Sequence, residues 1–202
     1  MNKFAGRGVC GGVAVGRISV FRRQDVQVKR IRVEDTAAEL LRLSAAKEAA
    51  LSQLREIYEK ALTEVGEANA AIFEIHMMMV EDEDYNDAIT EMIKGQSVNA
   101  EYAVAVTADN FAQMFSAMED AYMQARAADV RDISNRIIKC LGQDMSEQHT
   151  ADGSVIICAD DLAPSETVSL DKDRVLAFVT AYGSLNSHTA ILARSMNIPA
   201  MI

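Results

Sequence analysis

The sequence predicts an α/β domain interrupted by an inserted all-α subdomain. Residues 6–20 and the residues after 153 carry the short apolar runs and alternations that are typical of strands. Between them, apolar residues recur every three or four positions, which indicates amphipathic helices. The N-terminal strand segment is too short to bury a core alone, so we expect it to pair with the C-terminal strands. We therefore assign residues 1–31 and 146–202 to the α/β domain, and residues 32–145 to the helical insertion.

The first elements follow from local patterns. Alternating apolar residues predict one or two short strands, and these residues are Val13, Val15, Ile18 and Val20. Residues 22–32 are polar and basic, as expected of a connector. Thr36 and Glu39 have the spacing of a capping box, so a helix should begin at Thr36. Its apolar stripe continues for about 30 residues, until Gly66 interrupts it.

Three or four more helices should follow before the strands resume. Their apolar stripes contain Ile72, Ile75 and Met79, then Val104, Ala108, Phe111, Phe115 and Met118, then Val130, Ile133, Ile137 and Leu141. Gly142 is well placed to end the last of these helices. The continuous apolar runs 155–158 and 175–179 are typical of buried strands, and residues 198–202 have the same character.

Composition limits the function classes. The 202 residues carry a net charge of −10, which argues against nucleic acid and anionic membranes and suits a basic protein partner. No apolar run approaches the roughly 18 residues of a membrane-spanning helix. Residues 1–10 lack the apolar region of a signal peptide, so we expect a cytoplasmic protein. The three cysteines are scattered, which disfavours a disulfide or zinc framework.

The candidate active residue is His188, at a loop-to-helix junction. Ser187 is a plausible N-cap, and the apolar residues 190–196 should form a short helix that ends before Pro199. The first turn of a helix offers unpaired N–H groups and a positive dipole end, which attract an anion and disfavour an imidazolium. A histidine that attacks a phosphoryl group would use both effects. On spacing alone, a structural or capping role for His188 is equally open.

Four segments together resemble a known family. The run Ser187–Ala200 resembles the phosphohistidine motif of the Enzyme I family, and related motifs occur in pyruvate phosphate dikinase and phosphoenolpyruvate synthase. Segments 71–84, 126–133 and 159–167 resemble three further Enzyme I signatures, in the same order along the chain. The chain departs from the family pattern at Cys10–Gly12, at Ala68, and at Tyr182 and Asn186 in the active loop.

The resemblance implies a fold and an activity. It implies an incomplete phosphohistidine (swivelling) domain with an inserted helical-hairpin subdomain that binds the carrier protein HPr. The implied reaction passes a phosphoryl group from phosphoenolpyruvate to HPr through His188, in the sugar phosphotransferase system. Thr167, Ser187 and Arg194 would support it. Family members continue into a barrel domain that binds phosphoenolpyruvate and Mg²⁺ and dimerises. We therefore expect a fragment without its own metal ligands, from a protein that is a homodimer at full length.

The resemblance also implies a docking face for HPr. Its residues would be Glu67, His76, Met78, Met79, Asp82, Glu83, Asp84 and Arg126. Taken alone, His76 is more typical of a structural histidine, and the acidic run is more typical of a solvated helix start. Two alternatives remain at this stage. One is a nitrogen-regulatory or multi-domain paralogue with the same phosphohistidine relay, and the other is a helical module that binds a partner without chemistry.

Overall fold

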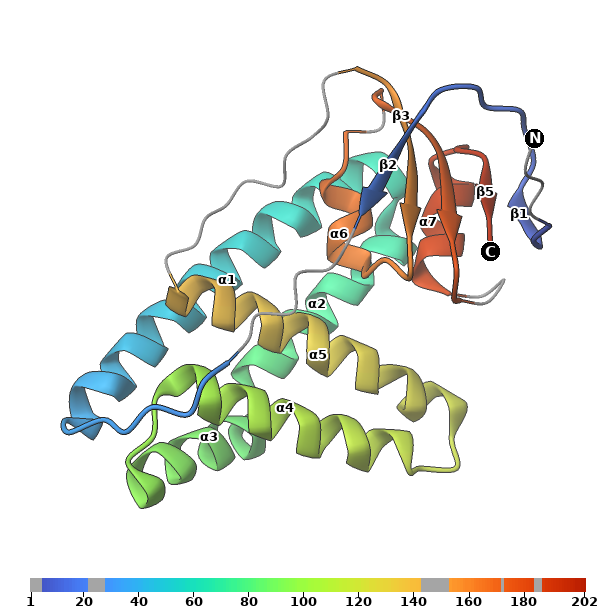
Figure 1. Cartoon of the computed structure of the whole chain (residues 1–202). Coiled ribbons are helices and arrows are strands. Elements are labelled where there is room, and N and C mark those ends of the chain that lie inside the picture. Colours follow the sequence, from blue (N-terminus) through green and yellow to red (C-terminus); the bar gives the residue numbers. More distant parts are fainter. Residues whose placement is uncertain (1–4, 22–27, 143–152, 172, 184–186) are drawn as a thin grey trace. The chain divides into compact units, whose positions relative to one another are not determined.

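The computed structural model describes residues 5–21, 28–142, 153–171, 173–183 and 187–202 (Figure 1). The chain divides into two compact units. We call residues 1–24, 57–72 and 148–202 the α/β unit, and residues 25–56 and 73–147 the helical unit. Residues 57–72, which the sequence assigned to the insertion, thus group with the strands.

The α/β unit contains a five-stranded sheet with the order β1-β5-β4-β3-β2. Its strands are β1 (Gly8–Cys10), β2 (Arg17–Phe21), β3 (Val155–Ala159), β4 (Val175–Thr180) and β5 (Ala200–Met201). Figure 1 shows β2, β3 and β4 side by side; they pair in parallel, as do β4 and β5, while β1 is antiparallel to β5. Both N-terminal strands therefore pair with C-terminal ones, as predicted.

One sequence prediction in this unit is wrong. Val13 and Val15 were expected in a strand, but they lie between β1 and β2 with 93% and 89% of their surface exposed. Neighbouring glycines explain this. Gly12 adopts a φ of 149°, in the region that favours glycine, and Gly16 approaches so close to Leu176 that an added Cβ would lie 2.4 Å from Leu176 Cδ1. The segment between β1 and β2 is therefore a connection between the two strands and not part of a strand.

The core of the α/β unit lies on one face of the sheet. Val155, Ile157 and Phe178 point into it from β3 and β4, and alternate residues of β3 are less buried. Two short helices, α6 (Pro164–Ser169) and α7 (His188–Ser195), belong to this unit, and Ala193 of α7 joins the same cluster.

Residues 57–72 are attached to these short elements by two side chains. Lys60 donates from Nζ to the carbonyl of Leu170 at 3.2 Å, and Asn69 donates from Nδ2 to Ser195 Oγ at 3.0 Å. These contacts explain why this part of the helical sequence belongs to the α/β unit.

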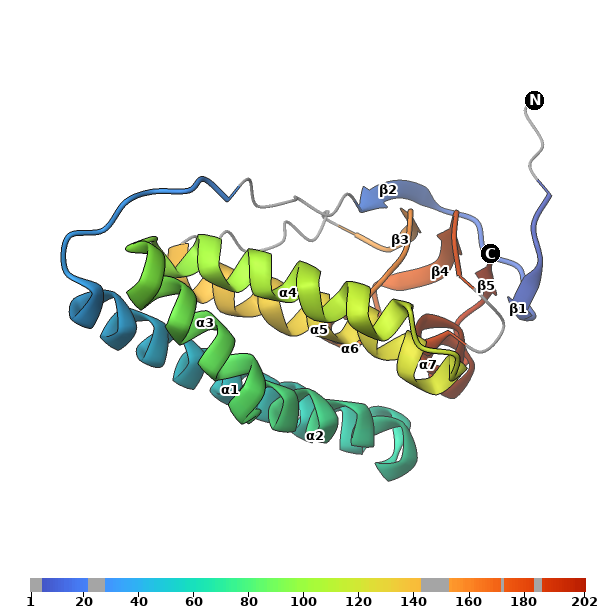
Figure 2. The same cartoon turned by 90° about the horizontal axis from the view of Figure 1, so that it is seen from below.

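Helices account for most of the helical unit. The elements are α1 (Thr36–Val65), α2 (Glu67–Glu81), α3 (Glu83–Gln96), α4 (Ala100–Ser116) and α5 (Ala121–Gly142), of which α1 and α2 continue into the α/β unit. Figures 1 and 2 show α4 and α5 side by side. The 30-residue α1 begins and ends as the sequence predicts, and Gly66 separates it from α2.

The predicted capping box at the start of α1 is wrong. Asp35, not Thr36, is the capping residue, because its Oδ1 accepts hydrogen bonds from the N–H groups of Ala37 and Ala38, both at 2.9 Å. Glu39 is engaged elsewhere, since its Oε1 accepts the N–H of Ala100 at 2.6 Å. A long-range partner therefore takes the side chain that local spacing assigned to the cap.

Candidate functional site

The loop-to-helix junction at His188 has the predicted local structure. Ser187 is the N-cap of α7, with φ −65° and ψ 155°, and its Oγ accepts the N–H of Ala190 at 3.3 Å. His188 is the first residue of the helix. It therefore lies in the turn whose N–H groups have no partner within the helix, where an anion is favoured. The side chain of His188 lies outside the described part of the structure, as does Asn186.

The position of α7 is fixed by its next residue. Thr189 is buried, and its Oγ1 donates to the carbonyl of Leu162 at 2.7 Å. Ala190, Leu192 and Ala193 are buried along the same short helix. The Thr189 bond joins the start of α7 to the loop between β3 and α6, so the backbone of His188 is held next to a segment that also carries Thr167.

Thr167 is completely buried within α6, and its hydroxyl is already in use as a donor. Oγ1 lies 3.0 Å from the carbonyl of Ala163 and donates to it. A hydroxyl has one hydrogen and two lone pairs. In any further hydrogen bond with an imidazole, the Thr167 hydroxyl must therefore accept an N–H. It cannot donate to an unprotonated ring nitrogen. The predicted contact of Thr167 with His188 stays a prediction.

Arg194 lies toward the other end of α7. It is exposed in the last turn, six residues after His188 and thus about 9 Å further along the helix axis at about 1.5 Å per residue. The helix is regular over this span, and its C-cap Met196 is αR. Only a side chain that extends back along α7 would reach the first turn, so a role in neutralising phosphate charge stays a prediction.

The junction of α2 and α3 carries the predicted docking residues Met78, Met79 and the acidic run. Met78 is 69% exposed, and Met79 is partly exposed. Asp82 is the N-cap of α3 and accepts the N–H of Tyr85 at 2.9 Å. Glu83 and Asp84 are exposed in the first turn, where acids are favoured by the helix dipole. The acidic run is therefore a helix start, and it also borders an exposed apolar side chain.

The prediction that His76 lies on the docking face is wrong. The side chain is completely buried, with Nε2 at 3.3 Å from Asp129 Oδ1 and Nδ1 at 3.7 Å from Asp132 Oδ2. Residues 76 and 78 of one helix are about 200° apart around its axis. Since Met78 faces solvent, His76 faces the interior. A fully buried side chain cannot touch a partner, although it can act through the helix that carries it.

Two other predicted docking residues are placed differently. Arg126 is largely buried at 9% exposure, donates from Nη1 to Asp129 Oδ2 at 2.8 Å, and lies over the Tyr122 ring at 4.3 Å from its centroid. Little of it is available to a partner. Glu67 is exposed as the first residue of α2, but it belongs to the α/β unit. Its role in docking stays a prediction.

Sequence reasoning missed the acidic partners of His76. Asp129 and Asp132 both belong to segment 126–133, which was recognised only as a family signature. A local signal was present, because Asp129 lies four residues before Ile133 and so shares its buried stripe on α5. An acid on a buried stripe requires a charged or hydrogen-bonding partner. A histidine within the apolar segment of another helix was the available partner.

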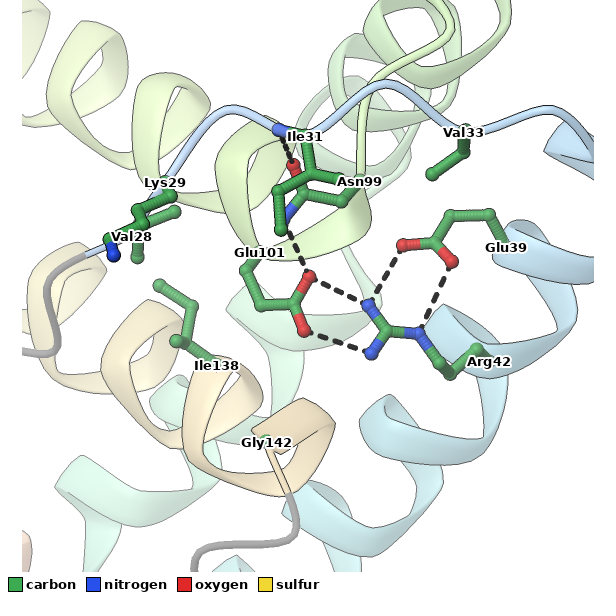
Figure 3. A pocket seen from close by; sticks show the side chains of 10 residues that line it. All are labelled: Val28, Lys29, Ile31, Val33, Glu39, Arg42, Asn99, Glu101, Ile138 and Gly142. Atoms are coloured by element: carbon green, nitrogen blue, oxygen red, sulfur yellow. Dashed lines mark hydrogen bonds and ion pairs between the residues drawn. The ribbon is translucent and has the colours of Figure 1, made fainter.

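A cavity of about 450 Å³ lies in the helical unit (Figure 3). It is lined by Val28, Lys29, Ile31, Val33, Glu39, Arg42, Asn99, Glu101, Ile138 and Gly142. As Figure 3 shows, Arg42 is bound between the carboxylates of Glu39 and Glu101, with the shortest contacts at 2.8 and 2.6 Å. Glu101 also accepts from Asn99. These polar side chains bind one another, so the cavity carries no argument for a particular ligand.

Among the described residues, no group of three or more His, Cys, Asp and Glu side chains is arranged to hold a metal ion. In the same part of the chain, none of the helices has the length and apolar character needed to span a membrane. Burial raises the pKa values of the Cys140 and Cys158 thiols, which keeps them in the weakly nucleophilic protonated form.

Family models match almost the whole chain. Residues 5–126 match the N-terminal domain of PEP-utilising enzymes, and residues 151–202 match the mobile domain of PEP-utilising enzymes. The second match contains the junction at His188 and the α6 helix with Thr167.

Named relatives agree with these matches. Phosphoenolpyruvate-protein phosphotransferases from Mycoplasma capricolum subsp. capricolum, Enterococcus faecalis and Bacillus subtilis are 38%, 41% and 36% identical over 192, 193 and 203 residues. The alignments cover 95%, 95% and 100% of this chain, but 34%, 34% and 36% of those proteins. The chain thus spans about a third of the length of the curated relatives it matches.

Solved structures extend the agreement to the fold. A solution structure of Enzyme I matches with a TM-score of 0.77 at 34% identity, covering 96% of this chain and 80% of that one. The N-terminal domain of Enzyme 1 - Nitrogen matches with a TM-score of 0.68 at 26% identity, covering 97% and 81%. Sequence and fold together show that this chain belongs to the PEP-utilising enzymes and, among them, to the Enzyme I family of phosphoenolpyruvate-protein phosphotransferases.

Proposed function

We propose that this chain relays a phosphoryl group through His188, from phosphoenolpyruvate to an HPr-type carrier protein. The observation that carries the proposal is the position of His188. It is the first residue of α7, behind the cap Ser187, in a segment that matches the mobile domain of PEP-utilising enzymes. The N–H groups and the positive dipole end at the start of a helix suit a phosphate on this residue.

The relay consists of two successive displacements at phosphorus, each with in-line geometry. In the first, a ring nitrogen of His188 bonds to phosphorus while the bond from phosphorus to the enol oxygen of phosphoenolpyruvate breaks, and the enolate takes a proton to become pyruvate. In the second, a nucleophile on the carrier bonds to phosphorus and the N–P bond breaks. Positioning and charge stabilisation are the main demands of such steps on the protein.

The buried hydroxyl of Thr167 suggests how the ring would be prepared. Because Oγ1 already donates to Ala163, it would accept an N–H from His188. That bond fixes the proton on one ring nitrogen and leaves the lone pair on the other nitrogen for attack. Thr167 is therefore a positioning residue in the proposal, and Arg194 would contribute positive charge near the phosphate.

The activity of the whole protein is proposed on the basis of its relatives. We infer phosphoenolpyruvate binding, Mg²⁺ and dimerisation in a barrel domain, a cytoplasmic location, and a place in sugar uptake. When bound, Mg²⁺ would neutralise charge on phosphoenolpyruvate, and the described residues assign no ligand to it. A nitrogen-regulatory paralogue is the alternative, and the higher identity and TM-score of the Enzyme I match favour the sugar system.

The test is phosphoryl transfer in reverse, from a ³²P-labelled HPr-type carrier to this chain. We expect label on a histidine, stable in alkali and lost in acid, and we expect His188→Ala to remove it entirely. His76→Gln and His149→Gln are the matched controls, because the chain has three histidines. Both controls should still be labelled, at whatever rate their docking permits. Label that persists in His188→Ala, or that maps to either other histidine, would refute the assignment.

We further propose that the exposed corner between α2 and α3 in the helical unit docks the carrier. Met78 supplies an adaptable apolar contact, and Asp82, Glu83 and Asp84 supply a negative rim. A basic-rimmed carrier would be complementary to this corner. His76 is excluded as a direct contact by its burial.

A further inference from the structure

His76 lies between two carboxylates in the interior of the helical unit. Both carboxylates come from α5, Asp129 facing Nε2 at 3.3 Å and Asp132 facing Nδ1 at 3.7 Å. The His76 ring also packs edge-on against Phe73 of the same helix, with ring centroids 5.9 Å apart. Both ring nitrogens are fully buried, as are the facing oxygen atoms of the two acids. The distances are those of ion pairs, longer than the 2.7–2.9 Å that is typical of charge-assisted hydrogen bonds.

The two acids impose a protonation state on the ring. A neutral imidazole has one N–H and one lone pair, so one of its nitrogens would direct a lone pair at a carboxylate. An imidazolium has two N–H groups, one for each acid. Because two acids occupy opposite ends of the ring, the arrangement favours the imidazolium.

The same ion pairs reach a cation nearer the surface. Asp129 uses its second oxygen, Oδ2, to bind Arg126, and Arg126 lies over the exposed ring of Tyr122. These contacts thus connect two cations, His76 and Arg126, with two anions, Asp129 and Asp132. A neutral His76 would place no positive charge against either facing oxygen, which is costly in a low-dielectric interior.

This arrangement determines how α2 is rotated about its axis. His76 is held against α5, and the docking residue Met78 lies about 200° further around the same helix, so it points away from α5. We propose that His76 is a positioning residue, held as an imidazolium between Asp129 and Asp132, which orients Met78 and Met79 for the carrier. The orienting role depends on the docking function proposed above, whereas the protonation state does not.

The protonation state is tested by NMR on the ¹⁵N-labelled chain at pH 7. We expect a histidine with hydrogens on both ring nitrogens, identified as His76 because its signals vanish in His76→Gln. A single ring N–H on His76 at pH 7 would overturn the proposal.

A charge-rescue experiment tests the positioning role. His76→Gln removes the cation and should lower Tm by about 6 °C or more, the range expected for breaking a buried pair in a chain of this size. It should also weaken binding of an unphosphorylated HPr-type carrier about tenfold or more, equivalent to about 1.4 kcal/mol. Adding Asp132→Asn removes the acid that faces Nδ1 and should restore part of both losses. Glu74→Gln, an exposed change on the same helix, is the matched control and should alter neither.

Each outcome decides a separate claim. Binding by His76→Gln at the native affinity would refute the positioning role, and failure of Asp132→Asn to rescue Tm would refute the charge argument. If His76→Gln does not fold, the double variant and the NMR result still decide both. If neither the native chain nor any variant binds the carrier, the proposed docking function is refuted. The NMR result still decides the protonation state of His76.

Discussion

The phenol of Tyr85 shows how single buried polar groups are satisfied in the helical unit. Its Oη lies 2.7 Å from Ser134 Oγ, and Ser134 lies 2.6 Å from the carbonyl of Val130, to which it donates. Since Ser134 has one hydrogen, Tyr85 must be the donor in the first bond. Burial raises the pKa of Tyr85 to about 12, and this effect is larger than the lowering that comes from the hydrogen bond with Ser134.

The raised pKa of Tyr85 predicts a specific alkaline instability. The folded chain retains this proton up to about pH 12, whereas an unfolded tyrosine loses it near pH 10. Its stabilising effect is therefore complete below pH 10 and is lost as the pH rises toward 12. The free energy of unfolding should fall by about 1.4 kcal/mol per pH unit in this window because of this one group. Guanidinium denaturation between pH 9 and 12 measures it.

Tyr85→Phe is the matched variant for this prediction, because it keeps the ring and its edge-on contact with Phe111. In this variant, the free energy of unfolding should fall less steeply with pH between 10 and 12 than in the native chain. The difference in slope should correspond to one proton. Equal slopes in the two chains would show that Tyr85 does not retain its proton in the folded state.

At the scale of elements, the break between α1 and α2 depends on one residue. Gly66 has a φ of 82°, and an added Cβ would meet nothing within 4 Å. The requirement for glycine is therefore conformational and not steric. Without this residue in the left-handed region, the apolar patterns on either side would favour one continuous helix.

Substitution of Gly66 tests whether its left-handed conformation is what requires glycine. Gly66→Ala should lower the free energy of unfolding by about 1–2 kcal/mol, the cost of a left-handed conformation for an L-residue. Gly66→Asn should cost less, because asparagine tolerates this region. Urea denaturation of the three chains provides the ranking. An alanine variant as stable as the native chain would indicate that α1 and α2 can rearrange without a left-handed residue.

At the scale of the whole molecule, a net charge of −10 attracts basic proteins in general, so steering by the docking corner must be separated from it. Asp82→Asn, Glu83→Gln and Asp84→Gln together remove the rim, and asparagine at 82 keeps the cap on Tyr85. We expect slower association with an HPr-type carrier and a flatter salt dependence, because charge effects are screened within about 8 Å at physiological salt. Stopped-flow association at two salt concentrations measures both.

A charge-matched control completes the experiment. Glu34→Gln, Asp109→Asn and Glu119→Gln change the net charge by the same amount at exposed positions elsewhere in the helical unit. This control should retain most of the native association rate and salt dependence. If both triple variants slow association equally, steering arises from overall charge, and the acidic run is only a solvated helix start.

The extent of successful prediction follows the range of the interactions. Periodicity within one segment was sufficient for the bounds of α1, and the local cap was sufficient for the junction of Ser187 with His188. The shortness of the N-terminal strand segment was sufficient to predict that it pairs with C-terminal strands. Long-range partners defeated the sequence elsewhere. Glu39 binds Ala100, 61 positions away, and His76 binds acids on α5, so neither could be placed from its neighbours alone.

The parallel pairing of β2 with β3 has a consequence for synthesis of the chain on the ribosome. Ile18 pairs with Ile156, which is made about 140 residues later. At roughly 5–20 residues per second, β2 waits roughly 7–30 s for its partner. During that delay the whole helical unit, residues 25–56 and 73–147, leaves the ribosome first. Nascent chains should therefore acquire their helices early, and β2, with its apolar residues Ile18 and Val20, is the segment on which a chaperone would act.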